Sequence, residues 1–211
     1  MRIGCLHTAA SNINVFETAL AKVDAPSVTL VHRVRPDLLS QAQQYGGLNP
    51  EIERLTNAAL SDLSAEVDAV LLTCSTLGPC VTNERIGSVP VVRVDSALAK
   101  ESTCAGGRVV VLCAVETTLG PTTRIFVDAG KKLGASVEVR VVQDAWPLFL
   151  GGQITDYLAA VATAVAHAYE DGANVVALAQ ASMAGAADLV RGYPRPLCSP
   201  ASGLLAAMSA V

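Results

Sequence analysis

The stretch Val67–Pro79, V-D-A-V-L-L-T-C-S-T-L-G-P, decides the fold. Residues 69–73 form a short run without polar alternation, which predicts a strand buried on both faces of a sheet. Cys74 ends this run, and the residues that follow it are typical of turns and helix starts. Ligands bind at the carboxyl ends of strands in open α/β sheets. Cys74 is therefore a candidate reactive thiol, and the alternative is a small buried apolar side chain.

The same pattern recurs in the second half of the chain. The stretch 173–184, A-N-V-V-A-L-A-Q-A-S-M-A, aligns with 67–78 at an offset of 106 residues. This alignment places Gln180 opposite Cys74. The start of the chain aligns with 108–112 at the same offset. We infer two similar halves, each about the size of a small domain.

Helix and strand patterns alternate along both halves. Asn49, Pro50 and Glu51 form a strong helix-start signal, with a capping amide, proline in the first turn and an acidic residue beside it. Residues 144–152 have no regular pattern, and we expect an irregular segment there. The expected class is α/β, with a first lobe at 1–97 plus 201–211 and a second at 98–200.

The composition excludes several classes of function. The chain has 211 residues, of which 51% are hydrophobic and 16% charged, and its net charge is −4. We therefore expect no nucleic-acid partner, and no apolar stretch has the length of a membrane span. The six cysteines form no C-x-x-C pair, which favours reduced thiols and a cytoplasmic location.

Common cofactor and metal motifs are absent from the sequence. A phosphatase loop would need arginine at the position of Cys80, which lies six residues after Cys74. No G-x-G-x-x-G or G-K-[S/T] motif supports a nucleotide cofactor. His7, His32 and His167 are too scattered along the chain to predict a metal site. His7 ends the first expected strand, so it is a candidate for ligand binding, with a structural role as the alternative.

The two halves resemble the aspartate/glutamate/hydantoin racemase superfamily over essentially the whole chain. The resemblance rests on T-C-S-T at 73–76 and L-A-Q-A-S-M-A at 178–184, and on H-T-A-A-S-N at 7–12 and V-E-T-T-L-G-P-T at 115–122. It implies two pseudo-symmetric parallel-sheet α/β lobes with the active site between them. It also implies cofactor-independent proton transfer on a small carboxylate-containing substrate, by one cysteine from each lobe.

The resemblance also assigns roles to residues at matching positions. Cys74 matches the first catalytic cysteine, and Gln180 stands at the catalytic position where the second is expected. A glutamine amide is neither an acid nor a base near neutral pH, although it can donate a hydrogen bond to a carboxylate or oxyanion. The substrate-binding candidates are His7, Ser11, Asn12, Ser75, Thr76, Thr117, Thr118, Ala181 and Ser182.

Three functions follow as hypotheses. The first is a racemase or isomerase that acts on an amino acid or related carboxylic acid through Cys74. The second is a decarboxylase of the arylmalonate type, for which one thiol suffices. The third is a non-catalytic protein that binds an organic acid. We rank the racemase first and expect a homo-oligomer.

Overall fold

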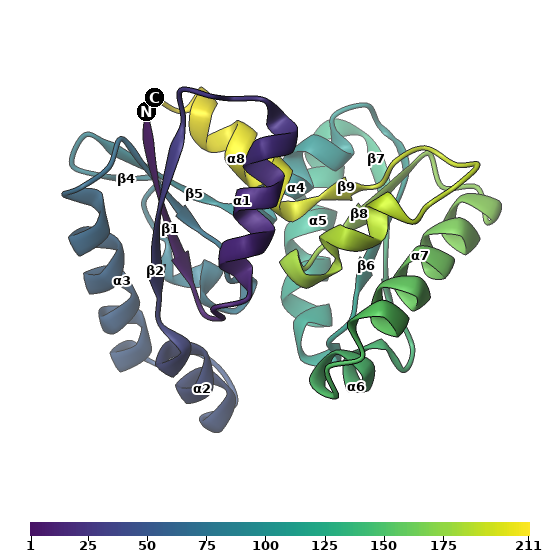
Figure 1. Ribbon diagram of the computed structural model, residues 1–211, viewed down its shortest axis with the longest axis horizontal. Coiled ribbons are helices and arrows are strands. Elements are labelled where there is room, and N and C mark those ends of the chain that lie inside the picture. The colour runs from purple at the N-terminus through teal and green to yellow at the C-terminus, as the bar shows by residue number, and fades with distance from the viewer. The chain divides into compact units, whose positions relative to one another are not determined.

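The structure is a computed structural model of the chain, and it describes residues 1–116 and 118–211. The chain forms two compact units, the first from Met1–Ala97 with Pro200–Val211 and the second from Leu98–Ser199. Figure 1 shows that each unit has strands at its centre and helices around them. No helix within the described ranges is both long enough and apolar enough to cross a lipid bilayer.

The first unit is built on a sheet with the strand order β2-β1-β3-β5-β4. Neighbouring strands run parallel, except that β4 pairs antiparallel with β5. The strands are β1 (Arg2–His7), β2 (Thr29–Val34), β3 (Ala69–Leu72), β4 (Arg85–Ile86) and β5 (Val89–Arg93). The helices are α1 (Asn12–Val23), α2 (Pro36–Gln44), α3 (Pro50–Ser64), the 3₁₀ helix η1 (Ser75–Cys80) and α8 (Ser199–Ser209). Helix α4 (Val94–Thr103) leads from this unit into the second.

The second unit repeats this arrangement with the strand order β7-β6-β8-β9, in which every neighbouring pair is parallel. The strands are β6 (Gly107–Cys113), β7 (Ala135–Val141), β8 (Val175–Leu178) and β9 (Leu197–Cys198). The helices are α5 (Leu119–Leu133), α6 (Ala145–Leu150), α7 (Ile154–Glu170) and the 3₁₀ helices η2 (Glu116–Thr118) and η3 (Ala181–Asp188). The α/β class with parallel sheets that the sequence predicts is confirmed.

The sequence offset of 106 residues is also an offset in the backbone register. Ile3 of β1 lies opposite Ala69 of β3, and Val109 of β6 lies opposite Val175 of β8. The 3₁₀ helices η1 and η3 begin at the same offset, directly after Cys74 and Gln180 respectively. The two units therefore place equivalent residues at equivalent points of their sheets.

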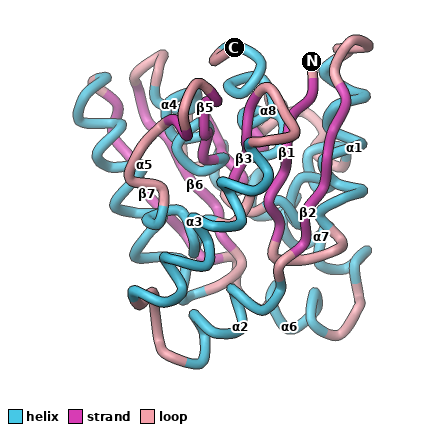
Figure 2. Tube along the Cα trace, turned by 90° about the vertical axis from the view of Figure 1, so that its left-hand side faces the viewer, coloured by secondary structure: helices cyan, strands magenta, loops and turns pink.

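Side chains alternate between the two faces of a sheet along a strand. Leu6 of β1 points into a core that includes Leu63 of α3, whereas the ring of the next residue, His7, lies 5.2 Å from that of Phe16 on α1. Helices α1 and α3 therefore cover opposite faces of the first sheet. Gly4 permits the close approach of α3, since a Cβ there would lie 2.6 Å from Leu63 Cγ. In Figure 2, β1, β2 and β3 run side by side with helices around them.

Two local expectations have different outcomes. The helix start at Asn49 is confirmed, because Asn49 Oδ1 accepts a hydrogen bond of 2.9 Å from the Ile52 amide. The expectation of an irregular segment at 144–152 is wrong, because α6 occupies most of it. Trp146 and Phe149 stack at 5.1 Å, and Phe149 also packs on Tyr157 of α7. The helix therefore depends on contacts that a local sequence pattern does not contain.

Candidate active site

Cys74 is the second residue after β3, at the carboxyl edge of the first sheet, and it forms the N-cap of η1 with an extended backbone. Its side chain is half-buried and packs beside the core under α3. Ser75 and Thr76, the first residues of η1, are half-buried as well. Residues 74–76, which we call the Cys74 edge, therefore present one thiol and two hydroxyl groups in a row.

Burial separates Cys74 from the other thiols of the first unit. Cys80, at the end of η1, is buried, and burial raises the pKa of its thiol. Burial, together with the charge of Glu17, raises the pKa of the Cys5 thiol to about 12. Because a buried neutral thiol is a poor nucleophile and base, Cys5 and Cys80 are poorly suited to proton transfer.

The segment after β1 carries two residues with predicted binding roles, Ser11 and Asn12. Ser11 is exposed, and its side chain does not cap α1 because its backbone is already helical, with φ of −57°. Asn12 is half-buried at the first position of α1. Both residues lie after the carboxyl end of β1, which is a neighbour of β3 in the sheet.

His7 is fully buried, and both of its ring nitrogens have partners inside the first unit. His7 Nδ1 lies 2.9 Å from Thr73 Oγ1, and His7 Nε2 lies 2.8 Å from His32 Nδ1. His32 Nε2 lies 3.0 Å from a carboxylate oxygen of Glu17, which is half-exposed on α1. A continuous hydrogen-bonded chain thus runs from the protein surface to Thr73, the residue before Cys74.

The partners of this chain determine where its protons lie. The carbonyl of Leu6 can only accept, so the Thr73 hydroxyl donates to it over 2.9 Å and accepts from His7 Nδ1–H. Burial, with the charge of His32 as a smaller cause, lowers the pKa of His7 to about 4. His7 is therefore neutral and its Nε2 accepts a hydrogen bond from His32 Nδ1–H. The His7 ring supports the Cys74 edge from behind.

In the second unit, Gln180 occupies the place that Cys74 occupies in the first. It follows β8, forms the N-cap of η3 and is half-buried. Its Oε1 accepts a hydrogen bond of 2.6 Å from the Ala114 amide at the end of β6. This bond fixes the amide orientation, because a backbone N–H requires an acceptor. The Nε2 of Gln180, which bonds to no described residue, is thus left as a hydrogen-bond donor.

The other residues of the second unit with predicted binding roles differ in burial and in their hydrogen bonds. Ala181 is buried, and Ser182 Oγ lies 2.9 Å from the hydroxyl of the fully buried Tyr157. Burial raises the pKa of Tyr157 to about 12, so its hydroxyl keeps its proton. The Thr118 hydroxyl donates to the Val115 carbonyl over 2.7 Å. Thr117, another residue with a predicted binding role, lies outside the described residues.

The strands beside β3 and β8 reinforce the two 3₁₀ helices in different ways. Arg93 lies opposite Leu72 and stacks its guanidinium on Gly78 of η1, while Asp95 holds it through two hydrogen bonds of 3.0 and 2.7 Å. Cys198 takes the equivalent position in the second unit, and its thiol faces the carbonyl of Ala184 in η3. Sequence reasoning missed both residues because each strand pairing joins distant segments.

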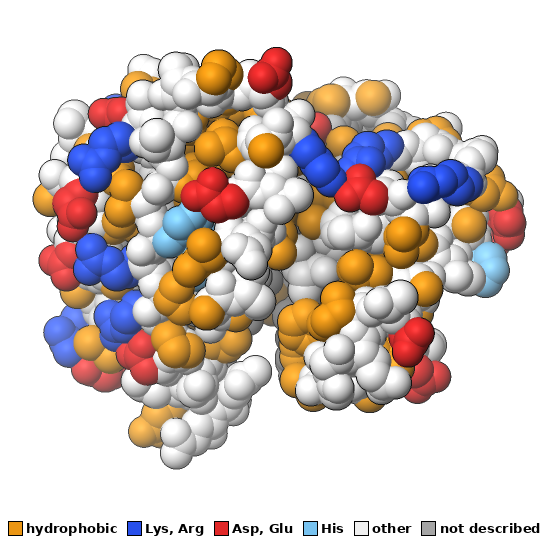
Figure 3. All heavy atoms as spheres, viewed as in Figure 1, with side chains coloured by type: hydrophobic (Ala, Val, Ile, Leu, Met, Phe, Trp, Pro, Cys, Tyr) orange, Lys and Arg blue, Asp and Glu red, His pale blue; other side chains and the backbone are white. Residues whose placement is uncertain are grey.

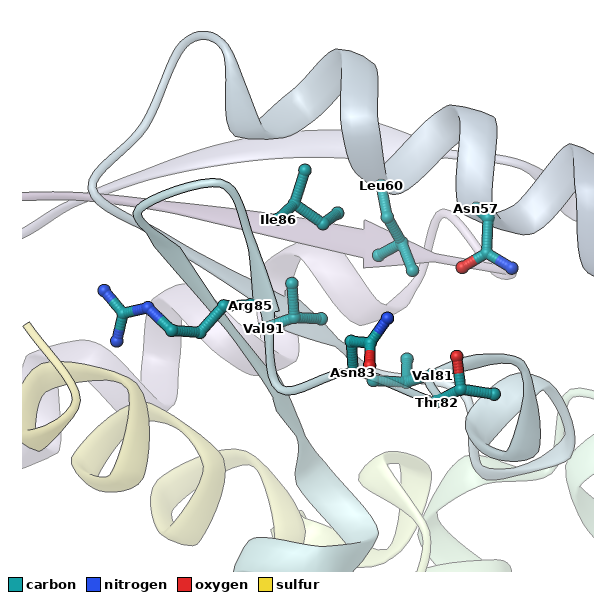
Figure 4. Close-up of a pocket in the computed structure, with 8 residues that line it drawn as sticks. All are labelled: Asn57, Leu60, Val81, Thr82, Asn83, Arg85, Ile86 and Val91. Atoms are coloured by element: carbon teal, nitrogen blue, oxygen red, sulfur yellow. The ribbon is translucent and has the colours of Figure 1, made fainter.

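Two hollows of the first unit lie away from Cys74. Figure 4 shows the first, a cavity of about 70 Å³ between α3 and the β4–β5 hairpin, lined by Asn57, Leu60, Val81, Thr82, Asn83, Arg85, Ile86 and Val91. This volume is too small for a substrate, which needs about 300 Å³ or more. The second is a shallow depression beside the end of α1. Figure 3 shows acidic and basic side chains interleaved on one face of the molecule.

Comparison with known proteins relates the chain to a protein family. The family model described as Asp/Glu/Hydantoin racemase matches residues 6–207. No curated protein sequence matches the chain. The fold is similar to that of Picrophilus torridus aspartate racemase, with a TM-score of 0.74, 14% identity, and coverage of 99% of this chain and 94% of that one.

Two further solved structures share the fold. Allantoin racemase from Pseudomonas fluorescens has a TM-score of 0.64 and 21% identity, with 99% of this chain and 90% of that chain covered. Glutamate racemase RacE1 from Bacillus anthracis has a TM-score of 0.65 and 12% identity, with 98% of this chain and 80% of that chain covered. At these identities the likeness concerns the fold.

Proposed function

Because the chain belongs to the Asp/Glu/hydantoin racemase family, we propose that it is a cofactor-independent racemase or isomerase that transfers a proton through Cys74. The proposed substrate is an amino acid or a related carboxylic acid, and the proton is the one on the carbon α to the carboxylate. The observation that carries the proposal is a half-buried thiol two residues past the end of β3, at the carboxyl edge of a parallel sheet.

The chemistry requires strong stabilisation of negative charge. Removal of a proton α to a carboxylate produces an enediolate-like dianion, which hydrogen-bond donors aimed at its oxygens stabilise. Ser75 and Thr76 supply hydroxyl donors beside Cys74. Gln180 supplies its Nε2, because its Oε1 is already bonded to the Ala114 amide. We assign Gln180 to binding the substrate carboxylate or the developing oxyanion, because an amide transfers no proton near neutral pH.

The experiment is isotope exchange at the α-carbon. The protein is incubated in D₂O with a panel of amino acids, hydantoins and 2-substituted malonates, and products are followed by proton NMR and chiral chromatography. We expect deuterium at the α-carbon and appearance of both enantiomers. Cys74→Ala should abolish this exchange, whereas Cys104→Ala, at an exposed thiol, should retain it. Exchange that survives Cys74→Ala would contradict the proposal.

One observation favours the decarboxylase as the second candidate. The second unit offers a donor amide at Gln180 and the hydrogen-bonded hydroxyl pair of Ser182 and Tyr157, in which the tyrosine keeps its proton. Such groups donate hydrogen bonds but remove protons poorly. Loss of CO₂ produces the same type of carbanion without a base, and Cys74 alone then protonates it. Release of CO₂ from a malonate, with one enantiomer formed, would identify this activity.

Two properties expected from the sequence remain part of this proposal. The cytoplasmic location rests on the six cysteines, which form no C-x-x-C pair and no disulfide among the described residues. The homo-oligomeric state rests on a general tendency, because symmetric homodimers are the commonest soluble oligomers. If a compound of the panel binds to the protein but shows neither deuterium exchange nor CO₂ release, the third hypothesis, a non-catalytic organic-acid-binding protein, would be favoured.

A further inference from the structure

A second group of reactive side chains lies behind the Cys74 edge, on the face of the first sheet that α1 covers. Cys5 Sγ and one nitrogen each of His7 and His32 all lie within 4.8 Å of one another. Their spacing in the sequence gave no reason to expect a metal site. The sheet brings them together, because Cys5 and His7 are two residues apart on β1 and His32 lies directly opposite Cys5 on β2.

Each histidine already has the outer partner that metal-binding histidines need. His7 donates Nδ1–H to Thr73, so its unprotonated Nε2 is the atom that can bind a metal ion. His32 donates Nε2–H to the Glu17 carboxylate, which leaves Nδ1. These two ligand atoms face each other at 2.8 Å. A carboxylate or hydroxyl on the far nitrogen fixes the tautomer and makes the imidazole a better ligand.

The second unit shows that the fold does not require this polar cluster. Val111 and Val139 form the cross-strand pair equivalent to Cys5 and His32, and they contribute to an apolar cluster that also contains Cys113 and Ala179. The latter two take the places of His7 and Thr73 at the 106-residue offset. Burying polar groups costs free energy unless they are fully paired. The first unit therefore buries polar side chains, at a cost in folding free energy, at positions where the second unit has apolar ones.

We propose that Cys5, His7 and His32 bind a divalent, thiol-tolerant metal ion such as Zn²⁺, with water as the fourth ligand. One thiolate and two imidazoles are a donor set that suits zinc. Ideal tetrahedral zinc separates its nitrogens by about 3.3 Å and sulfur from nitrogen by about 3.6 Å. The two rings therefore need to separate by only about 0.5 Å to admit the ion.

Binding of the ion replaces protons that the cluster now holds. The proton of the Cys5 thiol and the Nδ1 proton of His32 leave to solvent, and one sulfur–metal and two nitrogen–metal bonds form. The path to the surface runs along His32, whose side chain is 13% exposed, and Glu17, whose side chain is 51% exposed. The ion would join β1 and β2 and, through Thr73, support the Cys74 edge. This inference does not depend on the proposed function.

The test uses the full chain, stripped with a chelator and titrated with Co²⁺ as a spectroscopic substitute for Zn²⁺. We expect thiolate-to-cobalt charge-transfer absorption that saturates at one ion per chain. Cys5→Ser should remove this band, and Glu17→Gln should weaken binding about 10- to 100-fold, the usual effect of losing an outer partner. Cys113→Ser and Cys74→Ser, as matched thiol controls, should leave the band intact.

A second variant guards against misfolding. His32→Val installs the residue that stands at the equivalent place in the second unit, so it should fold, as judged by circular dichroism. Zn²⁺ should raise the melting temperature of the wild type but not that of His32→Val. The proposal is overturned if the wild type gives no cobalt–thiolate band, if the band survives Cys5→Ser, or if Cys74→Ser removes it.

Discussion

Replacing Thr73 with valine tests the hydrogen-bonded chain behind Cys74. The substitution keeps the shape of the side chain and removes one hydroxyl, which donates to Leu6 O and accepts from His7 Nδ1. Leu6 O stays paired, because the Thr73 amide also donates to it over 3.1 Å. The loss therefore falls on His7, whose ring is fully buried.

The expected cost follows from that unpaired nitrogen. A buried donor without an acceptor destabilises a protein by about 1–3 kcal/mol. His7 can move its proton to Nε2 and donate to His32 instead, which leaves an unpaired acceptor in place of an unpaired donor. We therefore expect Thr73→Val to lower the free energy of unfolding by about 1–2 kcal/mol, near the lower end of that range.

Thr56→Val is a matched control in the same unit. Thr56 is also fully buried, but its hydroxyl has no hydrogen-bond partner among the described residues. The Cys80 thiol lies nearby, and a thiol is only a weak hydrogen-bonding group. Removing an unpaired hydroxyl should leave stability unchanged or raise it. Both variants are measured by urea unfolding in chelator-treated buffer, at constant m-value. Equal shifts, or a stable Thr73→Val, would refute the hydrogen-bonded chain.

Two further predictions concern the same unit. Because burial lowers the pKa of His7 to about 4, from an unfolded value of about 6.5, the unfolded state binds more protons between these values. Stability should thus fall on acidification through that window, by on the order of 3 kcal/mol in total. The stability curve of His7→Gln should lack this fall, so the difference between wild type and variant should contain it. Gly78→Ala should destabilise the protein and displace Arg93 from Asp95, since the new Cβ would collide with the guanidinium. Gly120→Ala on α5, where a Cβ meets no atom within 4 Å, should not destabilise the protein when both glycine variants are compared by thermal unfolding.

The sequence by itself determined the features that depend on local chemistry and on repetition. Asn49 and Pro50 predict the start of α3, because capping requires residues only three positions apart. The offset of 106 residues predicts that Cys74 and Gln180 follow equivalent strands, because both copies share one pattern of apolar runs. Cys74 is therefore recognisable from sequence, since it stands directly after a buried strand.

Tertiary structure alone decided what surrounds those positions. His7 and His32 are 25 residues apart, and only the parallel pairing of β1 and β2 brings their rings into contact. The pairing with β3 places Thr73 on the far side of His7, and the packing of α1 brings Glu17 to His32. These contacts arise from strand register and helix packing, which join distant segments. No local pattern encodes them, so the sequence indicated a candidate cysteine but not the buried polar cluster behind it.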